Sequence, residues 1–312
     1  MAWAVEVEFV GRAEELGALR SWWETDADRP ALVWGRRRVG KTALIQEFAA
    51  GVDRVVFHTG TGDLAEAELA GLSSAAAEVF PDDIRDLATD PYRDWRDALD
   101  HLARMAQGGP VLLVLDEFPE LIGTFPALPG ILRAFLDQAR GSSGLRILIC
   151  GSAVRTIWSI QGTRAPLYGR FNLTLPLFPF RPAEAAVMLP RLSGTDRALV
   201  YGVFGGMPLY LNWWDQALSV GENLQKLAGR PGSQALTEGE LIMSVEVGGA
   251  EQSALVLHAI ANGRTRHNEI EQALGRGPDK GPGPAGRGAA DRAVGAGYCR
   301  VPARTASHIS HR

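Results

Sequence analysis

The chain has 312 residues, 46% of them hydrophobic and 22% charged, which is the composition of an ordinary globular protein with a packed core. Its formal net charge of −4 argues against a protein that coats nucleic acid by charge alone, although it leaves room for a local basic patch. The two cysteines, Cys150 and Cys299, lie in settings that match neither a metal knuckle nor a disulfide framework.

The sequence carries no export or membrane signal that we recognise. Met1–Val10 contains Glu6 and Glu8 and lacks the basic and then apolar regions of a signal peptide. The longest purely apolar runs, such as Val111–Leu115, are far too short to cross a bilayer. We therefore expect a cytoplasmic protein.

Short apolar runs alternate with helical patterns up to about residue 177, after a first helix expected at Ala13–Trp23. The expected strands are Ala31–Trp34, Val55–Phe57, Val111–Leu115, Arg146–Cys150 and Phe171–Leu177. The expected helices between them are Thr42–Ala50, one capped by Asp63 and running to about Phe80, one opened by Asp90-Pro91 and running through Met105, and Ile131–Ala139. This order predicts an α/β fold, a three-layer core in which helices cover both faces of a parallel sheet.

From Pro182 onward the strand signals stop, and three short helices are expected at Pro182–Leu192, Asp196–Phe204 and Pro208–Leu218. We predict a core over residues 1–178, a helical lid over 179–248 and a partial winged-helix module over 249–275. The remaining stretch, 276–312, is dense in Gly, Pro and Arg. We favour a disordered tail for it. A basic nucleic-acid arm and a C-terminus replaced by a shifted reading frame are the alternatives.

The segment from Gly35 to Thr42, which reads GRRRVGKT, matches G-x-x-x-x-G-K-[ST] in full. In such a loop the backbone N–H groups turn inward around phosphates, and the next helix points its positive end at them. Lys41 supplies a charge for the β- and γ-phosphates, and the Thr42 hydroxyl can bind Mg²⁺. Most side chains of Arg36–Arg38 are expected to face solvent or a partner. The nucleotide-contacting part of this segment is predicted as Gly35, Arg38, Val39, Gly40, Lys41, Thr42 and Ala43.

Two carboxylates, Asp116 and Glu117, follow the apolar run Val111–Leu115. Because parallel strands end at the edge where the nucleotide lies, these carboxylates are expected to face the metal. We predict that Asp116 holds Mg²⁺ and that Glu117 polarises the attacking water as general base.

Two further polar positions are candidates for catalysis. Ser152 ends the next strand, where its side chain could touch the γ-phosphate or orient the water; the alternative is a simple helix cap. Arg170 could neutralise charge on the γ-phosphate as an arginine finger. Arg155 and Arg164 compete for that role, and the finger could come from the same chain or from a neighbour.

In combination, these motifs resemble the archaeal-type ATPases, also found in bacteria, of the STAND branch of the AAA+ superfamily. The matching segments run from about residue 8 to 275 and are Phe9–Arg12, Gly35–Thr42, Leu115–Phe118, Gly151-Ser152, Leu167–Arg170 and Gly205–Leu211. The resemblance implies that Val10, Gly11 and Arg12 lie against adenine and ribose. It also makes Ser152 the sensor and Pro208 a lid residue that closes over the base.

The resemblance further implies a winged-helix module after the lid. Ala254–Ala261 and Asn268–Leu274 look like its first two helices, but neither a third helix nor a wing follows, so the sequence departs from the family there. The leading hypothesis is an ATP-dependent switch with slow, Mg²⁺-dependent hydrolysis and a DNA or protein partner at the C-terminal module. The alternative is a DNA-associated protein that ATP regulates with negligible turnover. A GTPase or small-molecule kinase is disfavoured, because N-K-x-D and D-x-x-G are absent.

Overall fold

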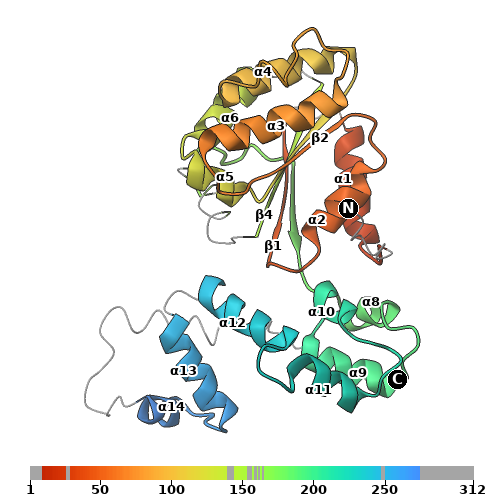
Figure 1. Cartoon of the computed structure of the whole chain (residues 1–312), viewed down its shortest axis with the longest axis vertical. Helices are drawn as coiled ribbons and strands as arrows, with labels where there is room; N and C mark the ends of the chain where they lie inside the picture. The colour runs from red at the N-terminus through yellow and green to blue at the C-terminus, as the bar shows by residue number, and fades with distance from the viewer. Residues whose placement is uncertain are drawn as a thin grey trace, which may run out of the picture. The chain divides into compact units, whose positions relative to one another are not determined.

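The computed structural model describes residues 9–25, 29–138, 144–152, 157, 160, 162–163, 165–246 and 250–274. The chain divides into two compact units, Met1–Leu227 and Ala228–Arg312 (Figure 1). The predicted core and lid both fall largely in the first unit. The predicted tail lies outside the described residues, as do Arg155 and Arg164.

A five-stranded parallel sheet forms the centre of the first unit. Its strands are β1 (Ala31–Gly35), β2 (Val55–Thr59), β3 (Val111–Asp116), β4 (Leu145–Gly151) and β5 (Leu173–Leu177). They lie in the order β2-β3-β4-β1-β5, and every neighbouring pair is parallel. The five predicted strands and the parallel sheet are confirmed.

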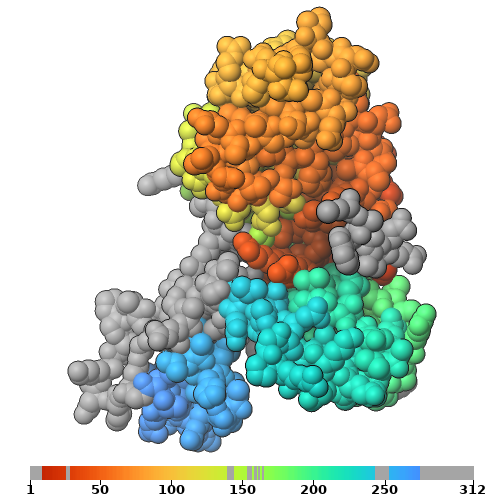
Figure 2. Space-filling model, in the orientation of Figure 1, coloured from red at the N-terminus to blue at the C-terminus, as the bar shows by residue number. Residues whose placement is uncertain are grey.

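The alternation of side chains along the strands creates the layers. Successive residues of a strand point to opposite faces of the sheet, so each buried strand must supply apolar groups to both. Leu32, Leu113 and Ile149 join the core on the side of α3 (Ala65–Val79), α4 (Trp95–Met105) and α6 (Leu128–Gln138). Val33, Val114 and Cys150 join the core on the side of α1 (Ala13–Glu24) and α2 (Lys41–Ala49). The three-layer arrangement is therefore confirmed (Figure 1), and α3 and α4 lie together on the face of the core seen in Figure 2.

Two helix starts differ from the prediction. The side chain of Asp63 accepts a hydrogen bond from the N–H of Leu64, and α3 begins two residues after Asp63 without a side-chain cap. Asp90-Pro91 does not open a helix either. Arg85 donates hydrogen bonds to the carbonyl oxygens of Asp90 and Pro91, at 3.0 Å each, and holds this stretch as a loop. α4 begins later, where Asp94 accepts a hydrogen bond from a main-chain N–H of the first turn.

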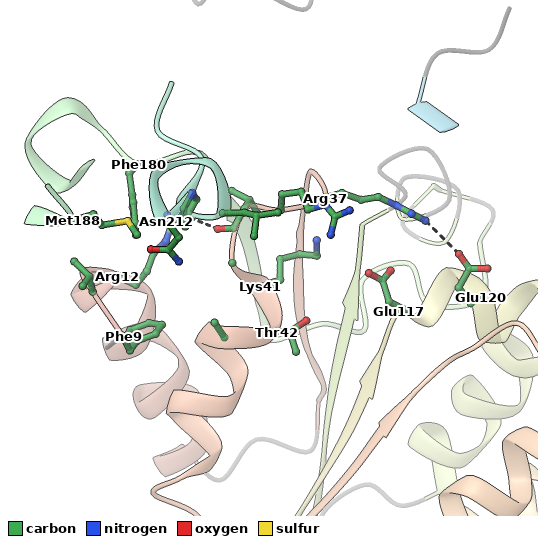
Figure 3. Close-up of a pocket in the computed structure, with 17 residues that line it drawn as sticks. Phe9, Arg12, Arg37, Lys41, Thr42, Glu117, Glu120, Phe180, Met188 and Asn212 are labelled. Atoms are coloured by element: carbon green, nitrogen blue, oxygen red, sulfur yellow. Dashed lines mark hydrogen bonds and ion pairs between the residues drawn. The ribbon is translucent and has the colours of Figure 1, made fainter. Parts of the chain in front are cut away.

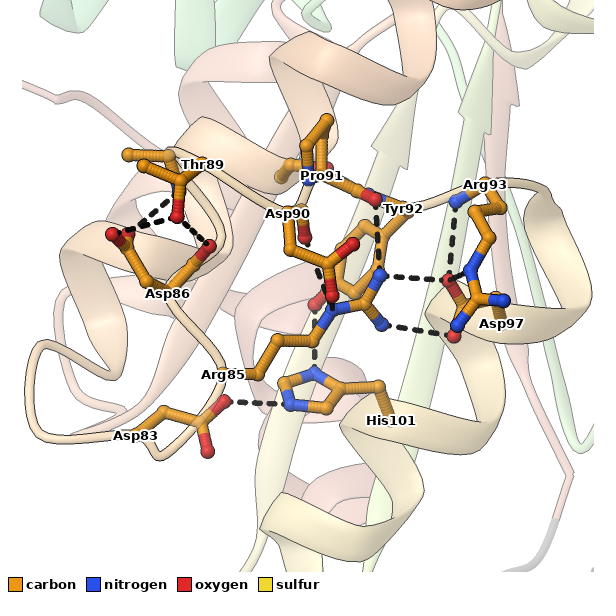
Figure 4. Close-up of polar contacts among 12 residues, drawn as sticks. Asp83, Arg85, Asp86, Thr89, Asp90, Pro91, Tyr92, Arg93, Asp97 and His101 are labelled. Atoms are coloured by element: carbon orange, nitrogen blue, oxygen red, sulfur yellow. Dashed lines mark hydrogen bonds and ion pairs between the residues drawn. The ribbon is translucent and has the colours of Figure 1, made fainter.

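A buried polar network fixes the same loop to α4 (Figure 4). Arg85 binds both carboxylate oxygens of Asp97 at 2.9 Å. His101 lies between Asp83, whose Oδ2 is 2.6 Å from Nε2, and the Tyr92 hydroxyl, which is 3.0 Å from Nδ1. Burial raises the pKa of Tyr92, so its hydroxyl stays protonated. Every polar group of this network has a partner, which favours a structural role.

Two shorter helices complete the core, η1 (Ala106–Gly108) and α5 (Phe118–Thr124). The lid part of the first unit contains α8 (Pro182–Val187), α9 (Gly194–Phe204), α10 (Pro208–Asn212) and α11 (Val220–Ala228). Three of these helices, α8, α9 and α10, were predicted from the sequence. The predicted ranges for α8 and α10 were longer than the helices in the structure. α11 was not predicted. They enclose a small apolar core of their own that includes Leu189, Val200, Leu211 and Trp214.

The second unit consists of α12 (Gln234–Glu246), α13 (Ala250–Ala261) and α14 (His267–Ala273). α13 contacts both α12 and α14. The two helices expected near residues 254–274 are thus present, and the winged-helix assignment stays a prediction. Among the described residues, no helix combines the length and apolarity needed to span a membrane.

Candidate functional site

The P-loop follows β1 at the carboxyl edge of the sheet. Arg38 and Gly40 adopt left-handed backbone conformations, with φ of 69° and 90°, which turn the loop back toward α2. α2 then begins at Lys41, so its N-terminal N–H groups face the loop. The buried Lys41 ammonium donates to the carbonyl oxygens of Gly35 at 3.2 Å and Arg36 at 3.1 Å. This geometry is an anion cradle with a cation held inside it.

Hard oxygen ligands meet next to the cradle. The Thr42 hydroxyl donates to Asp116 Oδ2 at 2.8 Å, although the two residues are 74 positions apart in sequence. Asp116 ends β3 and is almost fully buried. Mg²⁺ favours a protein site of one or two hard oxygen ligands completed by water and substrate phosphates, and this pair fits that requirement. Among the described residues, no group of three or more His, Cys, Asp or Glu side chains could hold a metal by itself.

Glu117 is held by its neighbours on both sides. Its backbone is left-handed, with φ of 46°, and its N–H donates to Asp116 Oδ1 at 2.9 Å. Ser152, at the end of β4, donates its hydroxyl proton to Glu117 Oε2 at 2.7 Å. The predicted sensor residue therefore contacts the predicted general base directly. A carboxylate in this position accepts hydrogen bonds and can also take a proton from water.

A cavity of about 560 Å³ extends from the cradle to the lid (Figure 3). Its phosphate end carries Lys41, Thr42 and Glu117, together with Arg37 and Glu120, whose Nη2 and Oε1 atoms are 3.6 Å apart. The other end, called here the base end, is mostly apolar. Figure 3 shows Phe9, Arg12, Phe180, Met188 and Asn212 there, and Val10, Pro208 and Leu209 also line the cavity. Pro208 reaches the P-loop itself, because a Cβ at Gly40 would lie 3.7 Å from its Cγ.

Arg12 joins the segments that meet at the base end. Its buried guanidinium donates to the carbonyl oxygens of Val39 in the P-loop, at 3.1 Å, and Phe178 after β5, at 2.7 Å. It also pairs with Glu15 at 3.0 Å and lies 4.4 Å from the ring centroid of Phe180. These contacts connect the start of α1, the P-loop and the strand that leads into the lid.

Most of the predicted site residues come together here. Those that line the cavity are Val10, Arg12, Arg38, Val39, Gly40, Lys41, Thr42, Ala43, Glu117 and Pro208. Asp116, Ser152 and Gly35 lie behind it through the hydrogen bonds given above. Gly11 lies against Phe180, where a Cβ would be 3.4 Å from the ring. Arg12 does reach the base end, but its guanidinium is engaged with main-chain oxygens.

Arg170 is the one predicted site residue that the structure does not bring to the cavity. It precedes β5, and just after it the N–H of Asn172 donates to the carbonyl oxygen of Pro30, the residue before β1. This contact and the parallel register of β1 and β5 place Arg170 at the amino edge of the sheet, whereas the P-loop lies at the carboxyl edge. A strand of this length separates the two edges by roughly 15 Å. Arg170 instead makes a two-pronged ion pair with Asp137 of α6, with its shortest N···O distance at 2.9 Å.

Several lining residues were not predicted from the sequence: Phe9, Arg37, Glu120, Phe180, Met188, Leu209 and Asn212. Phe9 and Leu209 are direct neighbours of predicted residues, so a wider reading of the same motifs would have included them. Phe180, Met188 and Asn212 belong to no phosphate-binding pattern. They reach the cavity because the lid folds back toward the P-loop, and sequence spacing does not encode that approach.

A parallel sheet of this strand order, with a P-loop after β1 and a carboxylate pair after β3, defines a P-loop ATPase with an AAA+ core. The sequence model of one family, described as an ATPase domain predominantly from Archaea, matches residues 9–213. The chain belongs to this family.

The individual proteins that resemble this chain share only a modest fraction of its residues. An uncharacterized protein of Methanocaldococcus jannaschii is 26% identical over 275 residues, which are 86% of this chain and 57% of that protein. The chain thus spans little more than half the length of that relative. The solved structure of a Walker-type ATPase of Pyrococcus abyssi superposes with a TM-score of 0.66 at 20% identity, covering 92% of this chain and 89% of the other. This likeness shows the fold.

Proposed function

We propose that this chain is an ATP-dependent molecular switch that hydrolyses ATP with the help of Mg²⁺. The observation that carries the proposal is the meeting of four residues from three segments at one edge of the sheet. Thr42 bonds to Asp116, and Ser152 bonds to Glu117, both beside the buried Lys41. A triphosphate in the cradle would meet a cation, a metal site and a base in one place.

Each group has a separate task in this proposal. The Lys41 ammonium exchanges its contacts with the carbonyl oxygens of Gly35 and Arg36 for oxygens of the β- and γ-phosphates. Thr42 and Asp116 would hold Mg²⁺, which would neutralise charge on the phosphates. Glu117 accepts a proton from the attacking water, while the Ser152 hydroxyl fixes the orientation of its carboxylate.

The switch itself depends on the lid. Pro208 lies against Gly40 of the P-loop. Arg12 connects that loop to the segment after β5 that leads into the lid. A nucleotide that fills the cavity contacts both parts, so its binding and release can bias how the lid lies on the core. Arg170 could act as an arginine finger only on the nucleotide of a second chain, because its own cavity opens at the other edge of the sheet.

The test combines binding and turnover. Lys41→Ala should lose most ATP affinity in a calorimetric titration, whereas Glu117→Gln should keep ATP affinity and lose turnover. Unchanged ATP affinity of Lys41→Ala would contradict the site assignment. Measuring turnover with and without DNA, and DNA affinity at two salt concentrations, separates the switch from a DNA-associated protein with negligible turnover.

A further inference from the structure

Among the described residues at the base end of the cavity, one polar side chain makes no hydrogen bond within the described part of the chain. Asn212, the last residue of α10, lines the cavity and is exposed. Its side-chain amide makes no hydrogen bond to any part of the chain that the structure describes. A carboxamide offers two donors and one acceptor oxygen, all of which are available here.

The other polar group at this end is already engaged. The Arg12 guanidinium is buried, and it donates to two main-chain oxygens and pairs with Glu15. The remaining neighbours at the base end are apolar or aromatic, among them Phe9, Phe180 and Met188. An aromatic base buried among them would need a hydrogen-bonding group for its polar edge, because an unpaired buried polar atom is costly.

The position of Asn212 is fixed even though its side chain is free. Its neighbour Leu211 is buried in the apolar core of the lid, which anchors the end of α10. Pro208 begins the same short helix and lies against the P-loop. Figure 3 shows the amide of Asn212 on the side of Phe180, Met188 and Arg12, away from Lys41 and Glu117. A nucleotide with its phosphates in the cradle would therefore extend its base toward Asn212.

We propose that Asn212 reads the nucleobase and makes the site selective for adenine. This inference rests on the proposed function, since it assumes that a nucleoside triphosphate occupies the cavity. The Asn212 oxygen accepts a hydrogen bond from the adenine N6 amino group, and its NH₂ group donates to the adjacent ring nitrogen. Asparagine forms this two-point contact with the N6 and N7 atoms of adenine, whereas guanine presents two acceptors at the same edge.

The first experiment needs no variant of the protein. Calorimetry compares ATP with purine riboside triphosphate, which lacks only the N6 amino group, and with GTP. We expect both analogues to bind about tenfold more weakly than ATP, as for the loss of one well-placed contact to a base. If purine riboside triphosphate and ATP bind equally well, Asn212 does not read the N6 group and the proposal is overturned.

The second experiment identifies the residue responsible. Asn212→Ala should weaken ATP binding about tenfold and weaken the binding of purine riboside triphosphate less, because the N6 contact is already missing there and only the contact to the ring nitrogen is lost. Asn212→Asp should weaken ATP binding without favouring GTP, because a carboxylate still accepts from the adenine N6 amino group but cannot donate to the ring nitrogen, and it would face the two acceptors of guanine. Asn262→Ala, at an exposed asparagine of the second unit whose side chain donates to the carbonyl oxygen of His258, is the matched control.

The outcomes separate this inference from the proposed function. If Asn212→Ala keeps the ATP affinity and the ATP-to-GTP ratio of the wild type, base reading by Asn212 is wrong, while ATP binding stands. If the wild-type protein itself fails to bind ATP, or Lys41→Ala binds it equally well, the proposed function is wrong.

Discussion

The phosphate end and the base end of the cavity are built in different ways. The phosphate end lies on the ends of β1, β3 and β4, and strand pairing fixes its residues, so that Thr42 and Asp116 are already in contact. The base end is assembled from the segment before α1, the strand leading into the lid and the short helix α10. Single contacts connect these pieces, chiefly those of Arg12 and Pro208.

This difference indicates which part of the site is held rigid and which part can change when the lid moves. A site on the sheet edge keeps its geometry whether or not the lid moves, as preorganised catalysis requires. A site shared with the lid changes when the lid moves, which is what the proposed switch requires. The two ends should therefore respond differently to substitution.

The largest effect is expected at the phosphate end. Asp116→Asn removes the charge that would hold Mg²⁺ and should lower ATP turnover about 100-fold or more, since metal-assisted charge stabilisation is worth several kcal/mol. Steady-state hydrolysis at varied Mg²⁺ concentration measures it. Asp53→Asn, at an exposed position before β2, is the control. Equal turnover in Asp116→Asn and wild type would show that the carboxylate at this edge is not part of the reaction.

The next largest effect is expected at the lid. Gly206 lies so close to Phe180 that an added Cβ would overlap the carbonyl oxygen of that residue. Gly206→Ala must therefore push the turn between α9 and α10 away from the segment that follows β5. We expect a loss of stability of about 1–3 kcal/mol and about tenfold weaker nucleotide binding. Gly202→Ala is the matched control, because nothing lies within 4 Å of its added Cβ. Urea unfolding and calorimetry measure the two effects, and similar behaviour of both variants would refute the tight contact.

A smaller effect on nucleotide binding is expected from the contacts by which Arg12 connects the two ends of the cavity. Arg12→Ala removes the hydrogen bonds to Val39 and Phe178, so it should weaken nucleotide binding about fivefold, the value of one modest hydrogen bond. Hydrogen exchange should become faster in the strand leading into the lid and stay unchanged in β3. Arg20→Ala, at an exposed position of α1, serves as the control. Faster exchange in β3 as well would mean that Arg12 supports the whole core rather than the lid connection.

The smallest effect is a dependence of stability on pH next to the phosphate end. Glu68 accepts hydrogen bonds from His58 and Thr61. Gly60, the residue before Thr61, donates its N–H to the carbonyl oxygen of Asp116, which connects this group to the phosphate end. Burial lowers the pKa of His58, against the raising effect of Glu68. Burial would raise the pKa of Glu68, but its hydrogen bonds from Thr61 and His58 outweigh this and lower it.

Both shifts have the same consequence for stability. A lowered pKa means that the unfolded state binds more protons, so stability present at neutral pH is lost as the pH falls, first below 6.5 for His58 and then below 4.5 for Glu68. Urea unfolding should show the first decrease, and His58→Gln should remove it. His267→Gln, at an exposed histidine, should not. A first decrease that persists in His58→Gln would assign it to other groups.

The residues that meet at the phosphate end could be named from the sequence for a physical reason. A backbone that wraps phosphate needs glycines and a lysine at fixed spacing, and a buried strand that ends in carboxylates stands out against its apolar residues. The parallel sheet and its layers follow from the alternation of strands and helices. The resemblance to a known family added Val10, Arg12 and Pro208, which no spacing rule would have found.

The rest depends on tertiary contacts that short patterns do not contain. Arg85 keeps Asp90 and Pro91 out of the helix from a position five residues earlier, so the helix start was predicted too early. Arg170 was a candidate arginine finger in the segment Leu167–Arg170, but the direction of β5 places it at the other edge of the sheet. Asn212 was not predicted because its role depends on how the lid folds back.

The buried thiol of Cys150 can be used to measure how often the sheet opens. It lies on β4 next to Asp116, and burial and that carboxylate raise its pKa well above the ordinary value, so it is protected from thiol reagents while the strand is packed. With Cys299 replaced by serine, the labelling rate of Cys150 would measure how often β4 separates from the strand that ends in Asp116. A bound nucleotide should slow that labelling without any dye or tag on the lid.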